Sequence, residues 1–192
     1  MTEARSSLAI KIINANPRAY EALVVESGTT DLARQLLEGV RPDQLHASPL
    51  AANAMLAALW LWHDALEESH LLSQKLDSPD GSYWHAIMHR REGDFSNSKY
   101  WLARCRSHPS SSVMAKSLPT LLQDHRTDRA VMAVAGSGWN PSAFVDLVEL
   151  IQDRPNDPRR PMVIAIQQLE WRVLFAHCSG DIAEGLSRTS PG

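Results

Sequence analysis

Apolar residues recur along most of this chain at the three- and four-residue spacing of amphipathic α-helices, and few stretches alternate as β-strands do. Helix starts are clearest where a capping residue precedes a proline, as at Ser48-Pro49 and Asn140-Pro141. Residues 54–62 are apolar on every side, which is typical of a helix at the centre of a bundle. The pattern therefore predicts an all-α, single-domain multi-helix bundle without a sheet.

The spacing and the capping residues together place the elements of this bundle. The predicted helices cover residues 17–27, 31–38, 49–76, 82–92, 95–107, 111–123, 127–135, 140–153 and 162–178. A turn is expected at Pro79-Asp80-Gly81, and three prolines predict a loop over 154–161. Because the last helix could not bury its apolar face alone, we interpret this loop as internal to one domain over residues 1–185, followed by a flexible tail at 186–192.

Composition adds limits on the class of protein. The 192 residues carry a formal net charge of −3, which disfavours disorder and a nucleic-acid binder that relies on positive charge. The two cysteines, Cys105 and Cys178, provide no disulfide framework, so we expect a reducing, cytoplasmic location. We expect neither an export signal nor a membrane span, because no apolar run is long enough.

Residues 84–109 contain a helix, a Gly93-Asp94 turn and a second helix that ends near a proline. The second helix has a small, large, small rhythm at Ser98, Leu102 and Cys105. This segment resembles a single tetratricopeptide-type hairpin, although the proline comes one residue early and no second copy follows. The wider segment 62–109 resembles a family of uncharacterised bacterial and fungal all-helical proteins, a resemblance that implies no activity.

Two polar stripes carry the candidate chemistry. On the predicted helix 49–76, a polar stripe extends the apolar face at positions i, i+4, i+7 and i+11, comprising His63, Glu67, His70 and Gln74. On the following helix, His85, His89 and Glu92 also share one side. Because a short turn makes these helices antiparallel neighbours, we expect four imidazoles and two carboxylates to meet in one pocket.

Three interpretations of this pocket remain open. In the first, His63, Glu67, His70, His85 and His89 bind a divalent transition metal, namely zinc, iron or manganese. In the second, metal-free acid/base catalysis uses His63, Glu67, His85 and His89. In the third, the same residues form a hydrogen-bonded network that only specifies packing.

The next helix provides residues that suit an anionic ligand. Its polar stripe consists of Asn97, Tyr100, Arg104 and His108, and an arginine fork beside an amide binds carboxylate or phosphate. The adjacent Arg90 and Arg91 are instead interpreted as surface charges paired with Glu92 or Asp94.

The sequence therefore supports two classes of function. The first is a bundle whose His/Glu/Arg pocket binds a small molecule or metal ion and acts on it by acid/base or metal-assisted chemistry. The alternative is a tetratricopeptide-like protein interaction module without catalysis. The first class predicts converging polar side chains, and the second predicts an exposed aromatic groove.

Overall fold

A computed structural model describes residues 2–16, 19–26, 28–105, 107–125, 127–136 and 138–180 of the chain. These residues form ten α-helices and two short 3-10 helices, and they include no strand. The prediction of an all-α bundle is confirmed. The predicted tail at 186–192 lies outside the described residues.

Most helices follow one another with short connections, whereas α1 and α2 are separated by residues 15–30. Their bounds are α1 Thr2–Asn14, α2 Asp31–Leu37, α3 Pro49–Trp62, α4 Leu66–Ser73, α5 Pro79–Glu92, α6 Phe95–Cys105, α7 Ser110–Leu121, α8 Arg129–Ala135, α9 Pro141–Ile151 and α10 Arg160–Ser179. The two 3-10 helices are η1 Pro42–Gln44 and η2 Gln123–His125.

Several helices begin where a capping side chain and a proline coincide. The Ser48 side chain accepts a hydrogen bond from the Ala51 N–H, and Pro49 occupies the first turn of α3. Asn140 caps α9 in the same way, accepting from the Ala143 N–H. The sequence predicted both of these helix starts from the capping residue and the proline, and the structure confirms them.

The predicted helix over residues 17–27 is wrong. Residues 19–26 form turns and extended backbone, and a helix not predicted, α1, precedes them. Tyr20 adopts a positive φ of 65°, and its buried ring stacks on Trp62 with the centroids 5.4 Å apart. The Val25 N–H donates to the Arg91 carbonyl of α5 at 2.7 Å. Contacts with distant parts of the chain therefore fix this segment, and they override the local capping signal.

The predicted single helix over 49–76 is also wrong, because it is broken after Trp62. Asp64 adopts a positive φ of 62°, which an α-helix cannot contain. Its carboxylate pairs with the Arg91 guanidinium at 2.6 Å. The chain restarts as the shorter helix α4 at Leu66, so the residues of α3 and α4 do not share one continuous helical face.

Residues 79–81 form the first turn of α5 and not the predicted loop turn. The Ser78 side chain accepts from the Gly81 N–H, and Pro79 follows the cap. Gly81 packs so closely on the preceding connection that a Cβ there would lie 2.3 Å from the Leu76 Cβ. Gly93, at φ +87°, ends α5 in the left-handed conformation and leads directly into α6.

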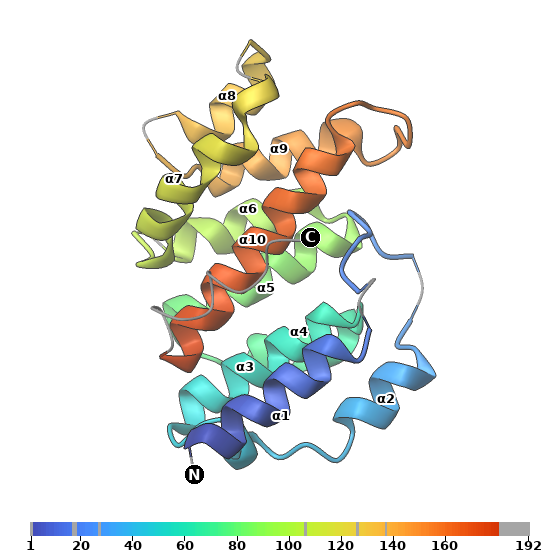
Figure 1. Cartoon of the computed structure of the whole chain (residues 1–192), viewed down its shortest axis with the longest axis vertical. Coiled ribbons are helices and arrows are strands. Elements are labelled where there is room, and N and C mark those ends of the chain that lie inside the picture. The colour runs from blue at the N-terminus through green and yellow to red at the C-terminus, as the bar shows by residue number, and fades with distance from the viewer. Residues whose placement is uncertain are drawn as a thin grey trace.

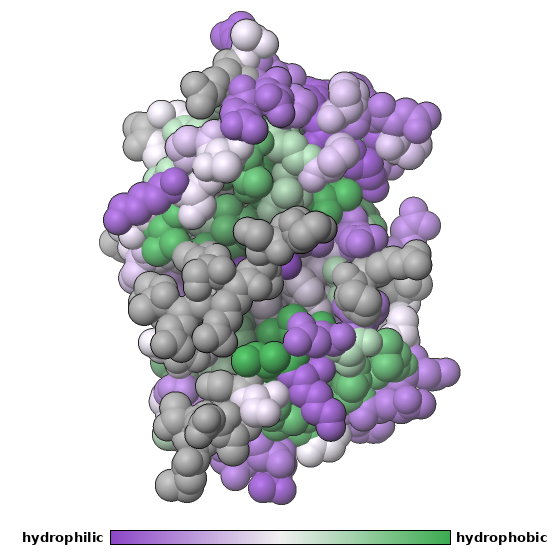
Figure 2. Space-filling view, in the orientation of Figure 1, coloured by the Kyte–Doolittle hydropathy of each residue, from purple (hydrophilic) through white to green (hydrophobic). Residues whose placement is uncertain are grey.

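The helices are arranged around α3, α5 and α10. In Figure 1, α10 crosses the molecule diagonally, with α1 to α4 at one end and α7 to α9 at the other. Nearly all of α3 is buried, and the Trp171 indole of α10 packs against Trp62 and donates to the Ala58 carbonyl at 2.9 Å. On the face shown in Figure 2, hydrophilic residues predominate at the top, and hydrophobic patches are visible below. None of the described helices is long and apolar enough to span a membrane.

Candidate metal centre

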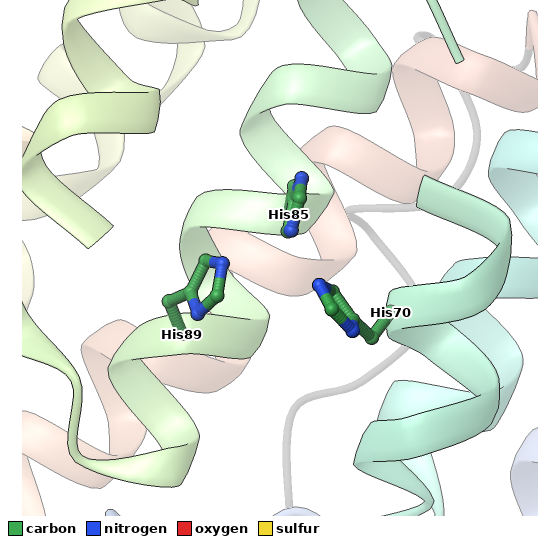
Figure 3. Close-up of side chains that lie close together, drawn as sticks. All are labelled: His70, His85 and His89. Carbon is green, nitrogen blue, oxygen red and sulfur yellow. The ribbon is translucent and has the colours of Figure 1, made fainter. Parts of the chain in front are cut away.

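Three histidines from α4 and α5 meet at one point of the fold. His70, His85 and His89 each offer a ring nitrogen, and these atoms all lie within 4.8 Å of one another. The ring centroids are separated by 4.6 Å between His85 and His89 and by 4.7 Å between His70 and His85. Figure 3 shows the three rings around a common space, with a nitrogen of His70 and one of His89 directed toward it.

His85 occupies the middle of this cluster, which we call the three-histidine site. It is buried, and neither of its ring nitrogens has a hydrogen-bond partner within the described structure. Its ring lies between those of His89 and Trp101, with the Trp101 centroid only 4.1 Å away. Buried polar atoms in native proteins nearly always have a partner, so an ordered water or a ligand is expected at these two nitrogens.

His89 is held by a carboxylate from its own helix. Its Nδ1 lies 2.5 Å from Glu92 Oε1, so Nδ1–H donates to the carboxylate and the ring keeps a lone pair on Nε2. Asn97 on α6 places its amide nitrogen 3.1 Å from this Nε2. A carboxylate that orients an imidazole from behind is the usual outer partner of a metal-binding histidine.

The environment favours the neutral imidazole at two of the three histidines, His70 and His85. The pKa of His85 is lowered to about 4, mainly by burial and then by the neighbouring His89 and His70. The pKa of His70 is also lowered, mainly by burial and then by His89. With these lowered pKa values, His70 and His85 are neutral near pH 7. The neutral imidazole is the form that binds a metal.

Two predicted members of the cluster lie elsewhere. His63 ends α3, and its Nε2–H donates to the Ile12 carbonyl of α1 at 3.0 Å. Burial lowers the pKa of His63 as well. Glu67 is exposed on the first turn of α4. The prediction that His63 shares a stripe with His70 is wrong, because the break at Asp64 separates α3 from α4, whereas Glu67 lies on α4 with His70.

The predicted anion-binding stripe is also divided. Asn97 contacts His89, whereas Tyr100 is 56% exposed and stands edge-on to Trp101. Arg104 is exposed, with its guanidinium carbon 5.1 Å from the centroid of the Trp101 ring. His108 lies in a different cluster.

Arg90 and Arg91 are not the expected surface charges. Both are fully buried on α5. Arg90 pairs with Glu170 of α10 at 2.6 Å, and each side chain is 1% exposed. Arg91 pairs with Asp64 and stacks on the Tyr20 ring at 4.0 Å. Their role is to hold the core together, because a buried guanidinium needs such a partner.

A second cluster, which sequence reasoning missed, joins Asp80, His108 and His177. Asp80 was assigned to a turn, although Ser78-Pro79 repeats the signal that begins α3 and α9. The His108 hydrogen bond holds the pKa of Asp80 below its usual value despite partial burial. His177, in the last turn of α10, also contacts the Asp80 carboxylate, and no local signal in the sequence predicts that contact.

The structure gives little support to an aromatic groove. Trp84 is fully buried, and Trp101 is half-buried against His85. The exposed large apolar residues are spread over separate helices, at Ile10, Leu32, Leu50, Leu71, Tyr100, Met132 and Leu150. Helices α5 and α6 follow one another through Gly93 and Asp94, and the tetratricopeptide-like hairpin and interaction module stay predictions.

A surface pocket of about 540 Å³ lies away from the histidines. It is lined by Glu21, by residues 155–158 of the α9–α10 connection and by the start of α10. It contains none of the predicted ligand or catalytic residues.

Comparisons with protein-family profiles, with curated proteins and with solved structures gave no match to this chain.

Proposed function

We propose that this protein binds a divalent transition-metal ion at the three-histidine site. The observation that carries the proposal is the convergence of His70, His85 and His89 within 4.8 Å, with both nitrogens of His85 buried and unpartnered. Imidazole nitrogen suits zinc, copper, nickel and iron. Zinc is the simplest probe, because it imposes no electronic preference on the geometry.

The side chains need only a small movement to hold such an ion. Zinc–nitrogen bonds of about 2.0–2.1 Å place neighbouring ligands of a tetrahedral site about 3.3 Å apart. The present separations of up to 4.8 Å therefore close by at most about 1.5 Å. His70 is the half-buried ring, on the short helix α4, and is the one with most freedom to move inward. The Asn97 amide would leave the Nε2 of His89.

Three protein ligands leave one coordination position open, which is the arrangement of catalytic zinc sites. A bound ion would supply Lewis-acid activation of water at that position. Glu92 would hold His89 in the ligating tautomer, since its carboxylate accepts the Nδ1 proton. A hydrolytic or hydration reaction is the class of chemistry that this arrangement supports.

Metal-free acid/base chemistry is the second candidate, and the Glu92–His89 pair favours it. The Glu92 carboxylate lies 2.5 Å from His89 Nδ1 and would orient the ring so that its Nε2 could accept a proton from a substrate. This candidate leaves the unpartnered nitrogens of His85 unexplained, so we place it second.

Metal analysis of matched variants tests the proposal. Chelator-treated full chain is dialysed against Zn²⁺, and bound metal is measured by plasma mass spectrometry. His85→Ala and His70→Ala should each lose one equivalent of Zn²⁺. His63→Ala should retain it, because His63 is as buried as His85 but bonded to Ile12. Retention by His85→Ala, or loss only in His63→Ala, would overturn the proposal.

A further inference from the structure

We propose that Asp80, His108 and His177 form a second divalent-metal site, independent of the three-histidine site, which ties together three distant parts of the chain. Asp80 lies in the first turn of α5, His108 in the α6–α7 connection and His177 in the last turn of α10. We call these three residues the clamp site. Two imidazoles and one carboxylate form a donor set that binds Fe²⁺, Mn²⁺ or Zn²⁺.

The ligand atoms of the clamp site already stand at the spacing of a metal polyhedron. Asp80 Oδ1 is 2.8 Å from His108 Nε2 and 3.2 Å from His177 Nε2. Bonds of about 2.0–2.2 Å to a metal place adjacent ligands about 3.0–3.4 Å apart. All three ligand atoms lie within 4.8 Å of one another, so two of the three edges need almost no change.

The outer partner of His108 is also in place. Its Nδ1 lies 2.7 Å from the Ser110 hydroxyl and accepts the Ser110 N–H at 3.2 Å, so Nε2–H now donates to Asp80. A metal at Nε2 would require the ring proton to move to Nδ1, where the Ser110 hydroxyl oxygen could accept it and the Ser110 N–H would give up its present bond to Nδ1.

Burial at the clamp site is graded in a way that suits ion entry. The side chain of His108 is 2% exposed, whereas those of Asp80 and His177 are 24% and 26% exposed. An ion therefore reaches the carboxylate and His177 from solvent and meets the fixed imidazole of His108 behind them. Because the ligands are separated by about 30 and 70 residues along the chain, closing them around an ion removes much chain entropy from the unfolded state.

Metal counting with Zn²⁺ tests this site separately from the three-histidine site. The wild-type chain should bind two equivalents, Asp80→Asn one and His85→Ala one, and the double variant none. Asp80→Asn keeps a hydrogen-bond acceptor for His108 and His177 and removes only the charged ligand, and circular dichroism checks its fold. If Asp80→Asn fails to fold, the half-exposed His177→Gln takes its place and should likewise lose one equivalent.

The outcomes separate the two sites. One equivalent in the wild type, lost in Asp80→Asn and kept in His85→Ala, would uphold the clamp site and reject the three-histidine site. An unchanged count in both Asp80→Asn and His177→Gln would overturn the clamp site. A thermal shift gives a second readout, because a chelator should lower the melting temperature of His85→Ala but not that of the double variant Asp80→Asn, His85→Ala.

Discussion

Replacing His85 by leucine should leave the metal-free protein at least as stable as the wild type. The ring has two buried nitrogens without a partner, and an unsatisfied buried polar group costs about 1–3 kcal/mol. The substitution removes both of these costs. It also removes the ring contacts with His70, His89 and Trp101, each worth about 0.5–1.5 kcal/mol, and leucine restores part of the apolar contact. The balance favours the variant by up to about 2 kcal/mol.

His63→Leu is the matched control. His63 is buried to the same degree as His85, but its Nε2–H donates to the Ile12 carbonyl at 3.0 Å. Losing that hydrogen bond should destabilise the protein by about 1 kcal/mol. The two substitutions are chemically identical, so the difference in sign isolates the missing partners of His85.

Urea unfolding in the presence of a chelator, followed by far-ultraviolet circular dichroism, measures both variants against the wild type. Melting temperatures provide a second comparison, at about 2–4 °C per kcal/mol for a chain of this length. If His85→Leu is destabilised as much as His63→Leu, then His85 belongs to a satisfied polar network and the argument for a ligand fails. If the three-histidine site binds metal, adding Zn²⁺ should stabilise the wild type and His63→Leu through that site. His85→Leu should not gain this stabilisation.

Three further predictions follow from the same structure. The pKa of His85 is about 4 in the folded protein and about 6.5 in the unfolded chain, so the unfolded chain binds more protons between these pH values. The free energy of unfolding of the metal-free protein, measured in urea, should therefore be at its full value above pH 6.5 and fall by about 1–3 kcal/mol toward pH 4. A free energy that does not change with pH over this range contradicts the prediction. Glu92→Gln should weaken Zn²⁺ binding about 10- to 100-fold in a competition titration while leaving the stoichiometry unchanged, and an unchanged affinity would show that Glu92 does not orient His89. Glu170→Ala should cost about 3–5 kcal/mol in urea unfolding because it leaves the Arg90 charge buried without its partner, and a cost below about 1 kcal/mol would mean that water replaces the carboxylate.

Local signals predicted most helix starts correctly, because each depends on one capping side chain and the next few residues. Ser48, Asp128 and Asn140 each accept backbone N–H groups at the start of the helix that they precede. Gly93 ends α5 in the left-handed conformation that its position in the sequence suggested. These interactions form within one turn of helix, so a single sequence contains them in full.

The predicted helices were wrong where a contact with a distant part of the chain determines the backbone conformation. Asn16-Pro17 has the same form as the dipeptides that start α3 and α9, yet residues 19–26 are not helical. Val25 bonds to the backbone of Arg91, about 65 residues away, and Asp64 leaves helical geometry to meet the side chain of the same arginine. A periodic pattern assumes a continuous helix, so it cannot reveal such a break.

The three-histidine site shows the same division. His85 and His89 share a face because α5 is continuous, and their i, i+4 spacing predicted that relation. His70 was assigned to the cluster through a stripe shared with His63, but it arrives on the separate helix α4 while His63 bonds to α1. The sequence thus placed His70 in the cluster correctly, but for a wrong reason, because the continuous helix over 49–76 does not exist. His177 had no signal of either kind, because only the packing of α10 brings it to Asp80.

The burial of α5 gives the strongest reason to regard His85 as functional. Both histidines and both arginines of this helix are buried, so each needs a partner that offsets the loss of water. His89 has Glu92, Arg90 has Glu170 and Arg91 has Asp64. Within the described part of the chain, His85 alone among these four has no hydrogen bond or ion pair, and it stands between two further imidazoles. A helix that pairs three of its four buried basic side chains with carboxylates and leaves the fourth facing other imidazoles agrees with the metal site that we propose.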